Sequence, residues 1–247
     1  ATCIANALID NGIAYRDRVV LFLDNSPEAV ISIFGILKAD AVFTVINPTV
    51  KEDKLAYILN NCRATGLITH SNKWKIAGKA ASKVHSLKSV IVIDGKNPGS
   101  STTDSSENTF TVMKWDEIIK RFPRTCPARH TIDIDLASLI YTSGTTGNPK
   151  GVMLTHQNMV SASTSITTYL ENCQNDIILN VLPLSFDYGL YQILMAAQFG
   201  GTVILEKSFL YPYVVINLLK KEHVTGFPLV PTIAAILMQM KELEKEQ

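Results

Sequence analysis

Short apolar segments and helix-like segments alternate along nearly all of the 247 residues, and this alternation limits the fold more than any other feature. The apolar runs at 19–24 and 41–46 predict strands. Between them, Ser26, Pro27 and Glu28 provide an N-cap, a proline at the first helical position and an acid in the first helical turn. Strands joined by single helices lie parallel in a sheet whose two faces are covered. The pattern therefore predicts an α/β fold with mostly parallel sheets covered by helices.

The same pattern continues toward the middle of the chain. Helices are expected at 52–61 and 73–84, and strands are expected at 66–69 and 89–94. Serine and threonine then dominate residues 95–110, where we expect a surface loop without regular structure.

A second alternating set follows a short helix that is expected at 115–122. In the connector before this set, Asp133 and Asp135 are expected to form the solvated start of a strand, without partners. We therefore divide the chain into one α/β subdomain at 1–135 and another at 136–247, which together predict layers of the αβαβα type. The second set comprises strands near Leu139, Val152, Ile178 and Val203 and helices at 159–170, 186–199, 213–221 and 232–246.

One polar segment between two of the expected strands carries the most chemical information. It reads YTSGTTGNPKG and occupies residues 141–151. Its glycines let the backbone expose consecutive N–H groups, its hydroxyls add donors, and Lys150 adds a positive charge, which together suit a polyphosphate. The segment differs from the Walker loop because Lys150 lies between Pro149 and Gly151. A polar hairpin loop without a ligand is the alternative that these residues leave open.

The longer segment YTSGTTGNPKGVMLTH, at 141–156, resembles the signature loop of the adenylate-forming superfamily. That superfamily includes acyl- and aryl-CoA synthetases, luciferases and the adenylation domains of peptide synthetases. Three other segments are similar to elements of the family: LKADAV with INP at 37–48, LPLSFD at 182–187 and FPLVPT at 227–232. The resemblance covers nearly the whole chain and implies an incomplete large N-terminal domain. The family's downstream magnesium-binding and ribose-binding segments have no counterpart here, and its main catalytic lysine is expected outside this chain.

The resemblance also implies roles for individual residues. The phosphates of the nucleotide would be bound by Thr142, Ser143, Gly144, Thr145, Thr146, Gly147 and Lys150. Among these residues, Thr146 would also contact Mg²⁺. The carboxylic acid substrate would contact Phe186, Asp187, Tyr188 and Pro231.

By the same resemblance, the chain is part of an AMP-forming acid–thiol ligase of fatty acid metabolism that uses ATP, Mg²⁺ and coenzyme A. The fragment alone would be inactive. Two alternatives stay open. Amino-acid adenylating relatives also carry a Phe-Asp pair like Phe186-Asp187, whose aspartate binds the substrate ammonium, so the chain could load a carrier protein. The other alternative is a non-catalytic phosphate-binding fragment.

Charge and composition narrow the range of partners. The 23 basic and 22 acidic residues give a formal net charge of +1, which gives no reason to expect binding to nucleic acid or to an acidic membrane. No apolar run reaches the roughly twenty residues of a membrane-spanning helix. Four scattered cysteines predict reduced, buried thiols in a cytoplasmic protein, without a metal site.

The last expected helix carries an apolar stripe that needs a partner. We expect either the missing remainder of the polypeptide or a second copy of the chain to cover this surface. The stripe consists of Ile233, Ile236, Leu237, Met240 and Leu243.

Overall fold

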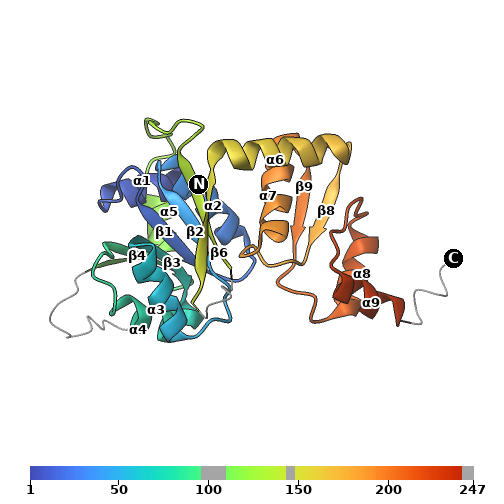
Figure 1. Ribbon diagram of the computed structural model, residues 1–247, viewed down its shortest axis with the longest axis horizontal. Coiled ribbons are helices and arrows are strands. Elements are labelled where there is room, and N and C mark those ends of the chain that lie inside the picture. The colour runs from blue at the N-terminus through green and yellow to red at the C-terminus, as the bar shows by residue number, and fades with distance from the viewer. Residues whose placement is uncertain (96–109, 143–147, 241–247) are drawn as a thin grey trace. The chain divides into compact units, whose positions relative to one another are not determined.

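The computed structural model describes residues 1–95, 110–142 and 148–240 (Figure 1). The chain divides into two compact units, Ala1–Ser161 and Ala162–Gln247. Each unit has its own parallel strands and its own hydrophobic core. Both units are therefore of the α/β type that the sequence predicts.

A sheet of seven strands forms the centre of the first unit, and these strands are β1 (Arg18–Phe22), β2 (Val42–Val45), β3 (Ala64–His70), β4 (Ser89–Ile93), β5 (Thr111–Lys114), β6 (Leu136–Thr142) and β7 (Lys150–Thr155). Their order across the sheet is β5-β4-β3-β1-β2-β6-β7. Neighbouring strands are parallel, except that β6 and β7 form an antiparallel pair. The mostly parallel sheet confirms the predicted fold class.

The helices that cover this sheet are α1 (Thr2–Asp10), α2 (Pro27–Lys38), α3 (Glu52–Asn61), α4 (Trp74–Ala81) and α5 (Trp115–Arg121). Helix α1 packs against α2 and α5, whereas α3 packs against α4. Strand β1 shows why helices are needed on both faces. Val20 and Phe22 belong to the core that includes α3 and α4, and the alternate residues Val19 and Leu21 are also fully buried. As predicted, Ser26 caps α2.

Helix α1 and strand β5 of the first unit were not predicted. Strand β5 pairs with β4 at the edge of the sheet, and its exposed and half-buried side chains lack the apolar run that marks the inner strands. The observed division between units also differs from the boundary expected between 135 and 136. Strand β6 pairs in parallel with β2, at Phe43 and Ser138. The two strands that flank the glycine-rich segment therefore belong to the first sheet.

The prediction that Asp135 is a solvated residue without a partner is wrong. Only 1% of its surface is exposed. Its carboxylate accepts hydrogen bonds from the Ile132 N–H at 2.8 Å and the Tyr15 hydroxyl at 2.7 Å, and it pairs with the Arg16 guanidinium. The Ile132 N–H, followed by Arg16 and Tyr15, lowers the pKa of Asp135 to about 2. Local spacing could not reveal this site because Tyr15 and Arg16 lie far away in the sequence.

We expect this carboxylate to make the stability of the first unit depend on acid pH. Because the pKa is lower in the folded state than the usual value of about 3.9, its stabilising contribution is complete above about pH 4 and is lost as the pH falls through about 2. Asp135→Asn should therefore lower the urea midpoint at neutral pH and flatten its dependence on acid pH. Fluorescence of the buried Trp115 reports unfolding of this unit.

Asp133→Asn is the matched control, because it changes an exposed carboxylate two residues away. This variant should keep the wild-type pH dependence. If Asp135→Asn and the wild type lost stability in parallel between about pH 4 and about pH 2, Asp135 would not be the group responsible.

The second unit contains two parallel strands that are connected through a helix. Its core consists of Leu179, Val181, Leu182, Val215 and Ile233. Helix α6 begins in the first unit and ends in the second. The elements of this part of the chain are α6 (His156–Tyr169), β8 (Ile177–Asn180), α7 (Asp187–Phe199), β9 (Thr202–Leu205), α8 (Pro212–Lys221) and α9 (Pro231–Met238).

Helix α9 is shorter than the expected helix at 232–246. It ends at Met238, and residues 241–247 lie outside the described residues. Ile233 is buried, whereas Ile236 is 41% exposed and Met238 is 85% exposed. An apolar edge therefore remains open on the described part of α9. Its coverage by a remainder of the polypeptide or by a second copy stays a prediction.

Two expectations from composition can be compared directly with the structure. Cys3 and Cys62 are buried free thiols, as predicted, but Cys126 and Cys173 are exposed. None of the helices in the described ranges has both the length and the apolar character that crossing a bilayer requires.

Candidate functional site

The glycine-rich segment begins and ends on the hairpin of β6 and β7. The predicted phosphate-binding residues Ser143, Gly144, Thr145, Thr146 and Gly147 lie outside the described residues. The two predicted residues that flank them, Thr142 and Lys150, are directly opposed across the hairpin, and both are exposed. Directly opposed residues place their side chains on the same face of an antiparallel pair. The structure therefore places the side chains of Thr142 and Lys150 on the same face of the hairpin.

Tyr141, the residue before Thr142 on β6, connects the hairpin to Asn61. It is opposed to Gly151, where an added Cβ would lie 3.3 Å from Cζ of the tyrosine ring. Glycine thus leaves room for the ring to lie across the strand. The Tyr141 hydroxyl donates a hydrogen bond to Asn61 Oδ1 at 2.5 Å. Burial raises the pKa of Tyr141, so the hydroxyl stays protonated and remains a donor at neutral pH.

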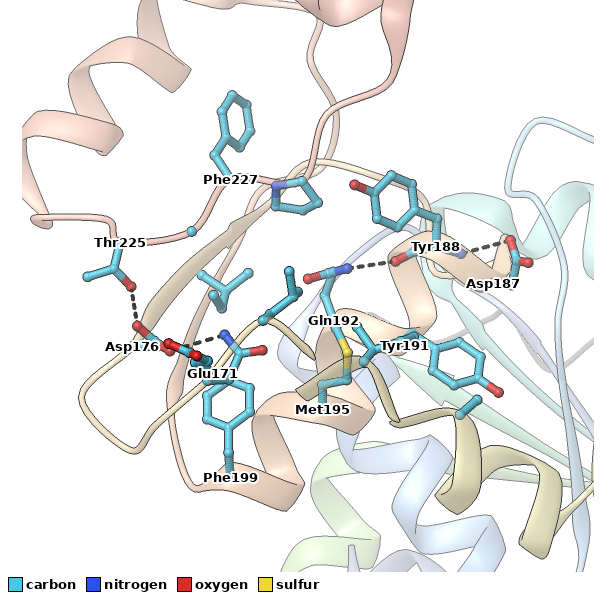
Figure 2. A pocket seen from close by; sticks show the side chains of 17 residues that line it. Glu171, Asp176, Asp187, Tyr188, Tyr191, Gln192, Met195, Phe199, Thr225 and Phe227 are labelled. Atoms are coloured by element: carbon cyan, nitrogen blue, oxygen red, sulfur yellow. Dashed lines mark hydrogen bonds between the residues drawn. The ribbon is translucent and has the colours of Figure 1, made fainter. Parts of the chain in front are cut away.

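A pocket of about 850 Å³ lies within the second unit (Figure 2). One wall is α7, whose residues Tyr188, Gln192, Met195 and Phe199 recur at helical spacing and line the pocket. The other walls come from the end of α6, the turn that follows it, β8 and the segment 225–228. At about 1.5 Å per residue, the wall formed by α7 is about 18 Å long. The pocket is therefore long enough for an extended or aromatic molecule.

Acidic residues stand at both ends of this pocket. Asp187 lies at the start of α7, and Figure 2 shows Glu171 and Asp176 at the other end. The described lining residues include no lysine, arginine or histidine. Burial, together with the charge of Asp187, raises the pKa of the lining residue Tyr191. The pocket is thus apolar along its length and negatively charged at its ends.

Asp176 is held in place as a charged group. Its carboxylate accepts hydrogen bonds from the Cys173 N–H at 2.9 Å, Asn172 Nδ2 at 3.1 Å and Thr225 Oγ1 at 2.9 Å. The first of these bonds, and then the other two, lower the pKa of Asp176. The carboxylate therefore joins the turn after α6 to the segment 225–228 and remains ionised at neutral pH.

Asn180 fixes the other side of the pocket from the end of β8. Its side chain is fully buried, its Nδ2 donates to the Gly189 carbonyl at 3.1 Å, and its Oδ1 accepts from the Leu182 N–H at 3.0 Å. Gly189 itself lies against the preceding backbone, because an added Cβ would be 2.5 Å from the Pro183 oxygen. The first turn of α7, which carries Tyr188, is therefore held against the segment 182–183.

We expect Gly189→Ala to destabilise the second unit. In an open helix this change would stabilise by up to about 1 kcal/mol, but here the Cβ meets backbone oxygens that cannot move cheaply. Overpacking of this kind costs about 1–3 kcal/mol, so the net effect should be a loss of stability. Hydrogen exchange of peptides from β8 and α7 should become faster in the variant, and calorimetry should show a lower melting temperature.

Ala197→Ser is the control for this experiment. Ala197 is exposed on the same helix, and exposed substitutions usually change stability by less than about 0.5 kcal/mol. A melting temperature of Gly189→Ala at or above that of the wild type would show that the close approach is not present in solution.

The predicted substrate residues fall into two groups. Asp187 and Tyr188 line the pocket. Phe186 is the N-cap residue of α7 and is 53% exposed, and Pro231 is the first residue of α9. Neither residue lines the pocket, so their contacts with the substrate stay predictions. Sequence reasoning missed Gln192, which is a buried polar residue on the wall of the pocket. Its position four residues after Tyr188, on the same face of the expected helix, was the sequence feature that could have identified it.

Comparison with known proteins gives consistent matches along the chain. A family model described as AMP-binding enzyme matches residues 1–247. The chain is 33% identical over 248 residues to 4-coumarate–CoA ligase 3 of Arabidopsis thaliana, and the match covers 95% of this chain and 40% of that protein. It is 26% identical over 239 residues to a component of the linear gramicidin synthase of Brevibacillus parabrevis, and the match covers 96% of this chain and 4% of that protein.

A solved structure shares the fold over the entire chain. It is the anthranilate CoA ligase AuaEII in complex with anthranoyl-AMP, with a TM-score of 0.86 and 26% sequence identity. The superposition covers 100% of this chain and 46% of that one. The chain thus spans less than half the length of each of these matched proteins.

Proposed function

The chain belongs to the AMP-binding enzyme family, whose model matches residues 1–247, and from this premise we propose that it is part of an ATP-dependent carboxylic acid ligase. In the proposed reaction, a carboxylate oxygen attacks the α-phosphorus of ATP and the bond to pyrophosphate breaks, which gives an acyl-AMP. The sulfur of a thiol then attacks the acyl carbon, and AMP leaves. We propose coenzyme A as the thiol, a choice supported by the similarity to the plant CoA ligase.

The pocket of the second unit is the observation that supports this proposal most strongly. Its apolar walls along α7 suit the hydrocarbon body of a carboxylic acid, and Asp187 and Tyr188, two of the four residues that we assign to the substrate, are among its lining residues. The related anthranilate ligase was solved with anthranoyl-AMP, which is an acyl-adenylate of the kind proposed here.

Thr142 and Lys150 have the chemistry for the phosphates of ATP. Both are exposed and directly opposed on the hairpin. A hydroxyl donor beside an ammonium group can stabilise the negative charge that builds up on the departing pyrophosphate. The assignment of the loop residues from Ser143 to Gly147 stays part of this proposal.

We propose magnesium only as the ion that is bound to ATP. In the residues that the structure describes, no group of three His, Cys, Asp or Glu side chains is placed to hold a metal ion. The proposed contact of Thr146 with Mg²⁺ falls outside those residues. We therefore assign no metal ligand among the described residues and derive no step through the ion.

Amino-acid adenylation is the second candidate, and the position of Asp187 favours it. This carboxylate lines a pocket without a basic residue among its described lining, so it could pair with the ammonium group of an amino acid. In that case the thiol acceptor would belong to a carrier protein. The similarity to the gramicidin synthase agrees with this candidate.

Acid-dependent exchange of labelled pyrophosphate into ATP tests the proposal and separates the two candidates. The assay uses the natural polypeptide that contains residues 1–247, with phenylpropanoic acid against phenylalanine and isocaproic acid against leucine. Each pair differs only by the α-ammonium group. We expect exchange with the plain acids, whereas exchange with only the amino acids would support the second candidate. Exchange with neither kind of acid would contradict both.

A further inference from the structure

Gln192 presents a hydrogen-bond acceptor on the apolar wall of the pocket. It lies in the middle of α7, and only 7% of its surface is exposed. Its Nε2 donates to the Tyr188 carbonyl at 3.2 Å. Figure 2 shows its amide oxygen on the side away from Tyr188, toward the space that the lining side chains surround.

The hydrogen bond to Tyr188 decides which way the amide faces. A backbone carbonyl can only accept, so it must meet the NH₂ group of Gln192 and not its oxygen. The Oε1 atom is thereby fixed toward the pocket. Among the described residues, the bond to Tyr188 is the hydrogen bond of the Gln192 side chain, and it leaves this oxygen without a donor. An acceptor on such a wall is costly to leave unpaired once a ligand has displaced the water around it.

We propose that Gln192 is a specificity-determining residue, whose Oε1 accepts a hydrogen bond from a hydroxyl group on the apolar body of the acid. This inference rests on the proposed function, because it takes the pocket to be the acid site. Aromatic side chains of Tyr188, Tyr191, Phe199 and Phe227 surround the pocket, and such walls suit a flat ring. A hydroxyaryl carboxylic acid fits both the walls and the acceptor.

The charges of the pocket exclude a different class of substrate. Glu171, Asp176 and Asp187 all line it, and none of the described lining residues is basic. A second carboxylate on the acid would be desolvated beside like charges, without a cation to pair with it. Dicarboxylic acids should therefore bind poorly, whereas an uncharged hydroxyl should bind well.

Calorimetric titration of the 247-residue chain with three matched acids tests this inference. The probes are phenylpropanoic acids that carry a para-hydroxyl, a para-methyl or a para-carboxyl group; the hydroxyl and the methyl are similar in size. The wild-type chain should bind the hydroxyl acid about tenfold more tightly than the methyl acid, since only the former offers Gln192 Oε1 a hydrogen-bond donor. The carboxyl acid should bind weakest. This ranking needs no variant.

Gln192→Met then identifies the acceptor. Methionine is similar in length to glutamine but offers no strong acceptor, so the preference for the hydroxyl acid should fall to about one or reverse. Gln198→Met is the matched control, because Gln198 is exposed on the same helix, does not line the pocket and donates to Thr164 Oγ1. It should keep the wild-type preference.

The outcomes separate this inference from the proposed function. If the hydroxyl and methyl acids bound equally well to the wild type, or if Gln192→Met kept the preference, the role of Gln192 would be wrong while the acid pocket would stand. If none of the acids bound, the assignment of the pocket to the acid would fail, and the role of Gln192 would fail with it.

Discussion

Replacing Lys150 and Thr145 together by alanine should lower acid-dependent pyrophosphate exchange by one to several orders of magnitude, each tenfold loss being about 1.4 kcal/mol of transition-state stabilisation. Negative charge builds up on the phosphates as pyrophosphate leaves, and the two side chains would supply an ammonium group and a hydroxyl donor there. Lys150 is exposed beside Thr142 on the hairpin, so its loss should not disturb a core. Thr145 lies outside the described residues, and its role rests on the family motif.

Lys54→Ala is the matched control for this experiment. Lys54 is exposed in the first turn of α3 and lies outside the signature segment. The control should keep the wild-type rate, and circular dichroism should show that all variants are folded. If the double variant were folded and exchanged pyrophosphate at the wild-type rate, the hairpin segment would have only a structural role.

The 247-residue chain by itself should show no measurable acid-dependent exchange. The matched CoA ligases are longer, and the chain covers 40% of one and 46% of another. We propose that the activity also needs groups from the parts that these residues do not match. Loss of a single oxyanion donor costs about 10²–10³-fold in rate, and several losses act together.

This expectation is tested on a chain that is shown to be folded. The calorimetric titration with aryl acids provides that check, because it requires an intact pocket in the second unit. Acid-dependent exchange by the 247-residue chain, at a rate that Lys150→Ala lowers, would show that these residues already hold a working site.

The alternation of strands and helices was enough to predict the fold class and most inner elements. It succeeded where both faces of a strand are buried, as in β1, because the apolar run then stands out. It failed for β5, whose exposed edge position needs no such run. The boundary between the units depended on the pairing of β6 with β2. The local spacing of apolar residues does not show which distant segments pair.

The candidate site could be predicted only in part, for a similar reason. Two family motifs led to these candidates: Thr142 and Lys150 belong to the glycine-rich segment, and Asp187 and Tyr188 stand at the end of the LPLSFD segment. Gln192 was missed because its importance depends on burial and on the direction of its amide. The role of Asp135 was missed because its two side-chain partners, Tyr15 and Arg16, come from the opposite end of the first unit's sequence.

The fate of the oxygen atoms of the acid tests the central claim most directly. The natural polypeptide that contains residues 1–247 is given a carboxylic acid labelled with ¹⁸O in its carboxylate, together with ATP, magnesium and coenzyme A. If the carboxylate attacks the α-phosphorus and the thiol then breaks the acyl C–O bond, one labelled oxygen must remain on the phosphate of AMP. Mass spectrometry should therefore find labelled AMP. Unlabelled AMP, or ADP with the label in inorganic phosphate, would contradict an acyl-AMP intermediate.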